Sequence, residues 1–468
     1  MRYCAIFVKL YLINKNWHSK LPFLLPDLIY KMTLQAKPDI EKHDASIFLF
    51  IKNYWWFLLI ILLALILAVV FIFSRFNAFK NFYGSPLQTS DYPKTTGAES
   101  NEINNYIKTD LPACDSQNSQ LTVSPVSIAN ITDIAPLGNF NPQGGHVFPT
   151  EHIYFYLKKP AGEDFNVAPI EVPLYAPADI WITSIRGSEH LSENPIFIDY
   201  GLEFYLCSGL QGLFAHVSTI SAEMAALLKE PYQQEDTYEA GGKSYRMFEK
   251  AVNIKVKAGE QIGTVGGRAG QNALDLSFYD FGSAPLAYAN PSRWYGKLFY
   301  VVCALDYYSE ELKPVLEAKL GYGKPRTIKP LCGEVNQDIS GSAQGVWFVK
   351  GTTDTYPEDP HITLAHDNFD PGYAVFSIGR SLANYGLDAG VYSFTLRDTG
   401  LVDRDFKDVK PDGNIYCYDV NQNYQGRTEY KASIQLQLTD ATTLRMGTKS
   451  SKCGSSPWNL ASFLEFER

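Results

Sequence analysis

Short hydrophobic runs that alternate with polar residues cover most of the chain, and one much longer run is apolar throughout. Between residues 121 and 300 the short runs are separated by Gly, Pro and Asn, a pattern typical of β-strands joined by turns. They read HIYFYL (152–157), EVPLYAP (171–177), DIWITSI (179–185), PIFIDYGLEFYL (195–206) and LFAHVSTI (213–220). One helix is expected among them, from Ser221 to about Leu228, because Ser221 can cap its first turn and Glu223 adds negative charge there.

A second series of strands follows an expected helix near 309–320, whose leucines and Val315 fall at helical spacing. These runs read GVWFV, HITLAH, YAVFSIG, GVYSFTL, NIYCYDV, ASIQLQL and TTLRMG. The segment GYGKPRTIKP (321–330) separates the two series. We therefore predict a mainly β chain with two β-rich domains, residues 121–325 and residues 331–468, the second being a sandwich or a barrel.

The long apolar run is YWWFLLIILLALILAVVFIF (54–73), which contains no charged residue. As a helix it would be about 30 Å long, the thickness of the hydrocarbon core of a bilayer. We predict a single transmembrane helix that acts as a signal anchor. Residues 1–53 would form a cytoplasmic tail, with Met32 as an alternative start, and the polar residues 74–120 a linker.

The distribution of charge predicts the orientation of this span. Eight Lys and Arg residues precede it, whereas two follow it within the next twenty residues, so the positive-inside rule places the C-terminal bulk outside the cell membrane. Residues 81–468 carry 31 basic and 46 acidic side chains, a net charge of −15. Such an acidic surface argues against nucleic-acid binding.

Cysteine usage agrees with an oxidising compartment. Six of the seven cysteines follow the predicted span: Cys114, Cys207, Cys303, Cys332, Cys417 and Cys453. An even number outside the membrane is compatible with up to three disulfides, in any of fifteen connectivities. The alternative is that they are small buried apolar residues.

The first β domain contains an ordered set of phrases: GGHVFPTEHIYFY (144–156), VPLYAPADIWITSI (172–185), GLFAHVSTI (212–220), VKAGEQIGTVGG (256–267) and NALDLSFYD (272–280). Their glycines can adopt positive φ angles and allow tight strand reversals. In order and wording the phrases resemble the lysostaphin/LytM-type zinc endopeptidases of the duplicated-hybrid-motif fold, which cleave peptidoglycan cross-links. The resemblance covers residues 144–280.

The resemblance also implies a site, which this chain alters. The family binds zinc through an H-x3-D motif and the second His of H-x-H. Here those positions hold Phe148, His152 and Ser277, and the first His of H-x-H becomes Asp275. Phenylalanine cannot coordinate a metal, and a neutral serine hydroxyl is a poor zinc donor. His216 alone keeps its family identity, that of a catalytic helper.

Two interpretations of these residues remain open. In the first, His146, His152, His216 and Asp275 converge on a rearranged zinc site, with His146 and His152 as metal ligands and His216 and Asp275 as catalytic groups. In the second, the histidines are ordinary hydrogen-bonded residues of loops and strands. The second interpretation implies that no cofactor is bound.

We expect a membrane-anchored envelope protein whose peptidase-like domain has lost its zinc site. Such a domain would act as a binding or regulatory module rather than as an enzyme, with a cell-wall glycan or peptide, or an envelope hydrolase, as its partner. Aromatic residues expected near its groove are Tyr154, Tyr156, Trp181, Tyr205 and Tyr279. The alternative is an active metalloendopeptidase with the rearranged zinc site. A third possibility is a structural envelope protein whose C-terminal domain mediates assembly.

Overall fold

The computed structural model describes residues 103–160, 166–240, 243–424 and 427–468. The predicted cytoplasmic tail (1–53), the predicted span (54–73) and most of the predicted linker (74–120) lie outside these ranges. Among the described residues, none of the helices has the length and apolar character needed to cross a bilayer. The described chain is mainly β, as predicted.

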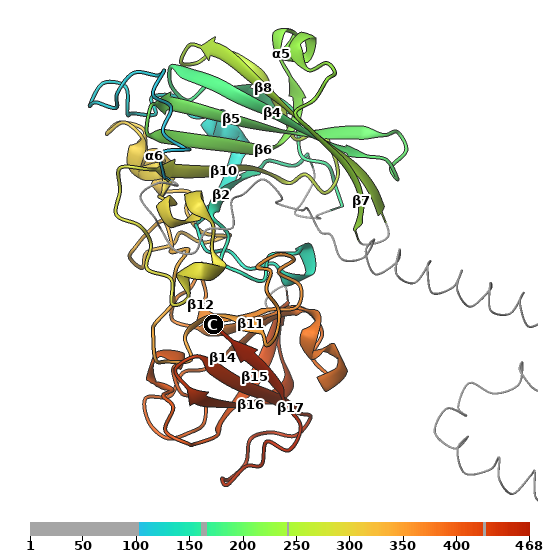
Figure 1. Ribbon diagram of the computed structural model, residues 1–468, viewed down its shortest axis with the longest axis vertical. Coiled ribbons are helices and arrows are strands. Elements are labelled where there is room, and N and C mark those ends of the chain that lie inside the picture. The colour runs from blue at the N-terminus through green and yellow to red at the C-terminus, as the bar shows by residue number, and fades with distance from the viewer. Residues whose placement is uncertain (1–102, 161–165, 241–242, 425–426) are drawn as a thin grey trace, which may run out of the picture. The chain divides into compact units, whose positions relative to one another are not determined.

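The first part of the described chain builds one ten-stranded sheet, in which the order β1-β2-β10-β6-β5-β4-β8-β7 is antiparallel and β3 and β9 pair beside it (Figure 1). The strand bounds are β1 Ile131–Ala135, β2 His152–Leu157, β3 Val172–Tyr175, β4 Ile180–His190, β5 Phe197–Cys207, β6 Leu210–Ile220, β7 Gln234–Ala240, β8 Lys243–Val256, β9 Gln261–Val265 and β10 Ala273–Asp280. Five of these, β2 to β6, coincide with the runs predicted from the sequence.

The second part forms a closed barrel in which neighbouring strands are antiparallel and β18 returns to pair with β11. Its strands are β11 Gly345–Val349, β12 Ile362–His366, β13 Ala374–Ile378, β14 Gly390–Phe394, β15 Tyr416–Tyr424, β16 Arg427–Asp440, β17 Thr443–Lys449 and β18 Leu464–Glu467. Closure leaves no unpaired edge, which decides between the sandwich and the barrel left open by the sequence.

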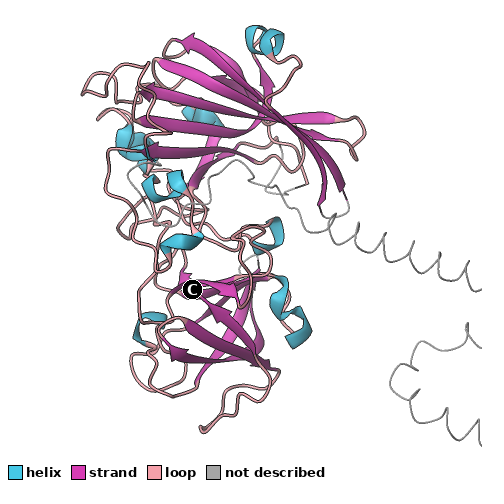
Figure 2. Ribbon diagram, in the orientation of Figure 1, coloured by secondary structure: helices cyan, strands magenta, loops and turns pink. Residues whose placement is uncertain are grey.

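The helices are short (Figure 2). α5 spans Ala222–Leu227, and the Ser221 side chain accepts the N–H of Met224 as the predicted cap. α6 spans Lys313–Glu317, within the predicted 309–320. The 3-10 helices are η1 Ile128–Asn130, η2 Pro142–Gly144, η3 Pro291–Arg293, η4 Gly296–Tyr300, η5 Ala304–Tyr307, η6 Arg380–Tyr385 and η7 Phe406–Asp408.

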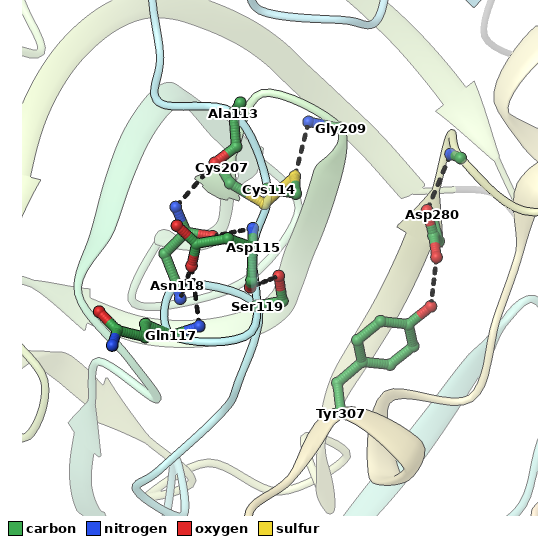
Figure 3. The surroundings of a disulfide bond; sticks show 11 residues. Ala113, Cys114, Asp115, Gln117, Asn118, Ser119, Cys207, Gly209, Asp280 and Tyr307 are labelled. Atoms are coloured by element: carbon green, nitrogen blue, oxygen red, sulfur yellow. Dashed lines mark hydrogen bonds between the residues drawn. A yellow bond between two sulfur atoms is a disulfide. The ribbon is translucent and has the colours of Figure 1, made fainter.

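All six cysteines that follow the predicted span are paired. The disulfides are Cys114–Cys207, Cys303–Cys332 and Cys417–Cys453. Figure 3 shows the first, which fastens a turn centred on Asp115 to the end of β5. The Asp115 carboxylate accepts the N–H groups of Gln117 and Asn118, so the turn keeps its shape. The prediction of up to three disulfides is confirmed.

The glycine-rich phrase 256–267 forms the predicted tight reversals. Gly259, Gly266 and Gly267 have φ angles of 80°, 82° and 76°. Gly263 is required for a different reason, because a Cβ atom there would lie 2.1 Å from the carbonyl oxygen of Thr219 on β6. Here glycine lets β9 pass close to β6, and so helps to fix the strand that carries His216.

Candidate functional site

The candidate residues lie on one face of three neighbouring strands. In the antiparallel ladder between β2 and β10, His152 is opposite Ser277 and Tyr154 is opposite Asp275. On the other side of β10, Asp275 is opposite Ala215 of β6. Because directly opposed residues point to the same face, the register brings His152 and Asp275 together. Residues distant in sequence thus share one surface.

His216 reaches this face through an irregularity in β6. Against β5, Phe214 pairs with Leu202 but Val217 pairs with Tyr200, so β6 has one extra residue between these pairs. His216 occupies this β-bulge with a φ angle of 61°, a left-handed conformation that non-glycine residues rarely adopt. In a regular strand His216 would point to the same side as the buried Phe214. The bulge therefore turns the imidazole toward Asp275.

The result is a chain of alternating carboxylates and imidazoles. His216 Nδ1 lies 2.7 Å from Asp199 Oδ2, and His216 Nε2 lies 3.4 Å from Asp275 Oδ2. The same Asp275 oxygen is 3.3 Å from His152 Nε2, and His152 Nδ1 is 3.7 Å from Glu151 Oε2. Each imidazole thus faces an outer carboxylate with Nδ1 and the shared Asp275 with Nε2.

Exposure varies along this chain, from a buried centre to a half-exposed His216. His152 and Asp275 are 7% and 6% exposed, whereas the His216 side chain is 45% exposed. Two buried atoms at the centre, His152 Nε2 and Asp275 Oδ1, have no hydrogen-bond partner among the described residues. Leaving such an atom unsatisfied costs about 1–3 kcal/mol. Because both atoms are covered by their neighbours, a polar ligand would satisfy them only if these side chains moved apart.

These neighbours shift the pKa values of the imidazoles. Burial lowers the pKa of His216, but Asp275 and Asp199 outweigh it and raise the pKa to about 10. Burial also opposes the protonation of His152, yet Asp275 and Glu151 raise its pKa above the usual value. The structure therefore favours a protonated His216 at neutral pH, and the carboxylates beside His152 shift that imidazole toward its protonated form as well.

His146 stands beside the chain rather than in it. Its ring meets the His152 ring edge-on, with 5.6 Å between centroids. Burial, and then the neighbouring His152, lower the pKa of His146, so its neutral form is favoured. The four residues proposed from the sequence thus lie close together, three of them in direct contact around the Asp275 carboxylate.

Phe148 and Ser277 occupy the two positions at which the resemblance implies a zinc ligand and this chain has a residue that is unsuitable as one. Only Ser277 lies at this centre. Ser277 is buried and lies opposite His152 on the neighbouring strand. Phe148 turns away and stacks on His361, with centroids 5.7 Å apart and ring planes within 8°. It also meets Trp294 and Phe348 edge-on. Its ring has become part of an aromatic cluster.

A family-type zinc site does not fit these residues, because a phenyl ring and a neutral hydroxyl replace two of its three ligands. The rearranged set predicted from the sequence, three imidazoles and one carboxylate, has suitable donor chemistry. In the part of the chain that the structure describes, however, no group of three or more His, Cys, Asp or Glu side chains is arranged so that it could hold a metal ion. The shared Asp275 oxygen separates the imidazoles of His152 and His216.

Sequence reasoning missed two members of the chain. Glu151 directly precedes His152, and Asp199 is a charged residue inside the strand phrase FIDYGLEF. A carboxylate directly after the apolar residues Phe197 and Ile198 was the available signal for Asp199, although Glu203 in the same strand gives a similar one. The bulge also has a signal, because the buried Phe214 and Val217 are three residues apart instead of the two expected in a strand.

The predicted aromatic groove needs a correction. Tyr205 and Tyr279 are each 1% exposed and belong to the hydrophobic core, so they do not line a surface. Tyr154 does lie beside His152, with 4.5 Å between the ring centroids, and Tyr156 lies beside Tyr154, with 6.2 Å between centroids. Trp181 is half-buried and lies under the ammonium group of Lys255.

Comparison of the chain with models of known protein families, with curated proteins and with solved structures finds no match.

Proposed function

We propose that this protein is a membrane-anchored envelope protein with a peptidase-like sheet that acts as a binding or regulatory module. Its partner would be a cell-wall glycan or peptide, which it would bind without cleaving, or an envelope hydrolase. The sheet would be a duplicated-hybrid-motif domain of the LytM type with a dismantled zinc site. Residues 54–73 would anchor it, and the cysteines and charge distribution support an extracytoplasmic position for the bulk.

The observation that carries this proposal is the pair of unsatisfied atoms at the centre of the ionic chain. Asp275 Oδ1 can accept a hydrogen bond from a ligand, and a protonated His152 Nε2, which faces Asp275 Oδ2 at 3.3 Å, can donate to a ligand that displaces this contact. A ligand that offers both N–H or O–H donors and carbonyl acceptors would satisfy both atoms. Peptide bonds, N-acetyl groups and sugar hydroxyls have this chemistry, and Tyr154 beside His152 offers a ring for packing.

The argument against cleavage rests on residue types. Phe148 cannot coordinate zinc, and Ser277 is a weak donor. The ionic chain also occupies Asp275 with two imidazoles, which opposes its use as a base. A domain of this kind can retain recognition after losing the Lewis acid that hydrolysis by its relatives requires.

The experiment measures binding of soluble wall fragments, a disaccharide with its stem peptide, to the full chain in detergent by calorimetry. We expect Asp275→Ala to weaken binding at least tenfold. The control is Asp179→Ala, which removes an exposed carboxylate paired with Lys257 elsewhere in the same sheet region. No binding by the unaltered protein, or equal binding by the Asp275→Ala variant, would contradict the proposal.

A second candidate function is metal-dependent hydrolysis, favoured by the contact of His152 and His216 with one Asp275 oxygen. In this alternative, as the sequence predicts it, His146 and His152 would hold zinc, which would supply a Lewis acid, and His216 and Asp275 would be the catalytic groups. The side chains would have to move, because the described residues contain no group arranged to hold a metal ion. Metal analysis of the full chain decides between the candidates. One zinc per chain that is lost in the His152→Ala variant, with chelator-sensitive cleavage of wall fragments, would favour the enzyme.

A further inference from the structure

The middle of the loop that precedes His152 is held by the barrel, whereas its two ends are hydrogen-bonded to the segment 138–141 of the first part of the chain. This loop, residues 146–151, connects His146 and Glu151 to β2. The contacts that fix its middle come from β12, β13 and the segment before β12, more than two hundred residues later in the sequence. The barrel can therefore contribute to the site whether or not it also mediates assembly with other envelope proteins.

The carbonyl oxygen of Val147 is the first point of attachment. It accepts hydrogen bonds from Thr363 Oγ1 at 3.0 Å and from Ser377 Oγ at 2.7 Å. Thr363 and Ser377 are directly opposed on β12 and β13, so both hydroxyls emerge on one face of the barrel wall. They are 1% and 0% exposed. Two buried hydroxyls thus converge on one backbone oxygen of the loop.

The next residue supplies the second attachment. Phe148 N–H donates to Glu358 Oε2 at 2.7 Å, and the Phe148 ring stacks on His361. Burial raises the pKa of Glu358 to about 8, although hydrogen bonds from the Phe148 and Val147 backbone oppose this. Both polar groups of this short backbone stretch therefore find their partners on the barrel, and the ring that replaces the family's histidine packs there too.

We propose that the barrel positions the loop 146–151, through Thr363, Ser377 and Glu358, so that His152 meets Asp275 with His146 and Glu151 beside it. A loop without these partners would leave buried backbone groups unsatisfied and would be free to move. Since His152 lies only five residues beyond Val147, a shift of the loop changes the geometry of the ionic chain. Thr363, Ser377 and Glu358 are positioning residues, because none of them touches Asp275 or a ligand.

A simple packing role would predict a different outcome, and the barrel offers a matched control. Ser433 on β16 is 1% exposed and donates to the Ser451 carbonyl at 2.8 Å, away from the loop. Ser377→Ala and Ser433→Ala therefore remove the same group from equally buried positions and should lower the melting temperature similarly. Only Ser377→Ala should alter the loop.

The test compares Ser377→Ala, Thr363→Val and Ser433→Ala in the full chain by hydrogen–deuterium exchange of the segment 141–157. We expect the exchange rate of this segment to rise about tenfold in Ser377→Ala and in Thr363→Val, the two loop variants, and further when both substitutions are combined. In Ser433→Ala the rate should match that of the unaltered protein. Thr363→Ser, which keeps the hydroxyl, should restore slow exchange. Loop exchange that stays equal in Ser377→Ala and Ser433→Ala would overturn the inference.

A second readout rests on the proposed function. The loop variants should bind the soluble wall fragments about three- to tenfold more weakly, whereas Ser433→Ala should bind normally. Failure of the unaltered protein to bind these fragments contradicts the proposed function, and the exchange measurement still decides the positioning role. Normal exchange together with weakened binding would contradict positioning by the barrel.

Discussion

His216 Nδ1 lies 2.7 Å from Asp199 Oδ2, the shortest contact in the ionic chain, and this pair orients the imidazole that the bulge presents to Asp275. Because the hydrogen bond uses Nδ1, the other ring nitrogen is left for the centre of the site. Asp199 belongs to β5 and His216 to β6, so the pair also joins the strands at the point where their register shifts.

The pair predicts that Asp199 helps to keep His216 protonated. We expect the Asp199→Asn variant to lower the pKa of His216 from about 10 toward the usual value near 6.5, since one of its two carboxylates is removed. An NMR titration of the imidazole protons measures this shift. His366, whose Nε2 lies 3.2 Å from Asp405 Oδ1 in the barrel, is an internal control and should titrate as before.

The same pair predicts how stability depends on pH. The pKa of His216 is higher in the folded than in the unfolded protein, so its stabilising contribution is complete below about pH 6.5 and is lost as pH rises toward 10. Urea unfolding between pH 6.5 and 10 should show a falling free energy of unfolding. The fall should be smaller in His216→Gln, and an equal slope in both proteins would assign it to other groups.

The left-handed backbone conformation of His216 predicts the relative stabilities of two variants at this position. Glycine tolerates a φ angle of 61° whereas alanine does not, so His216→Gly should be more stable than His216→Ala by about 1 kcal/mol. Both variants lose the imidazole and should bind wall fragments equally weakly. Urea unfolding measures the difference. A more stable His216→Ala variant would mean that the bulge relaxes when the side chain is removed.

Local patterns were enough to predict most of the strands, the α5 cap and an upper limit of three disulfides, but not β1, β7, β8 or β18. The cap formed by Ser221 involves only the first turn of its own helix, and the residues HIYFYL favour a strand through their own alternation and β-propensity. The site depends on pairings that no local pattern contains. That His216 turns toward Asp275 follows from one extra residue in β6, and that Phe148 leaves the site follows from aromatic partners that include Phe348 on the barrel. Residues 331–468 gave no sequence signal for their contact with Val147 and Phe148.

The disulfides predict a graded loss of stability. In a chain-entropy estimate, removing Cys114–Cys207, which closes 93 residues, should cost about 4.6 kcal/mol, and removing Cys303–Cys332, which closes 29, about 3.6 kcal/mol. The double Cys→Ala variants can be compared by urea unfolding under oxidising conditions. With reductant present, the unaltered protein should be less stable than either variant measured under oxidising conditions. A reversed order would show that packing at Cys303 and Cys332 outweighs loop closure.

Two glycines that follow β9, Gly266 and Gly270, should differ in how much stability is lost when each is replaced by alanine, although both have a positive φ angle. Gly266 and Gly270 have φ angles of 82° and 88°, so alanine is strained at both by about 1 kcal/mol. A Cβ atom at Gly266 would also lie 2.6 Å from the Ile170 carbonyl oxygen, whereas nothing lies within 4 Å at Gly270. Gly266→Ala should therefore lower the free energy of unfolding by several kcal/mol and Gly270→Ala by about 1 kcal/mol.

Gly266 is also connected to the site. The hydroxyl of Ser218, which lies two residues after His216, donates to the Gly266 carbonyl at 2.7 Å, so Gly266→Ala should also weaken ligand binding. Equal losses at the two glycines would show that Ile170 moves aside and that only backbone strain is measured.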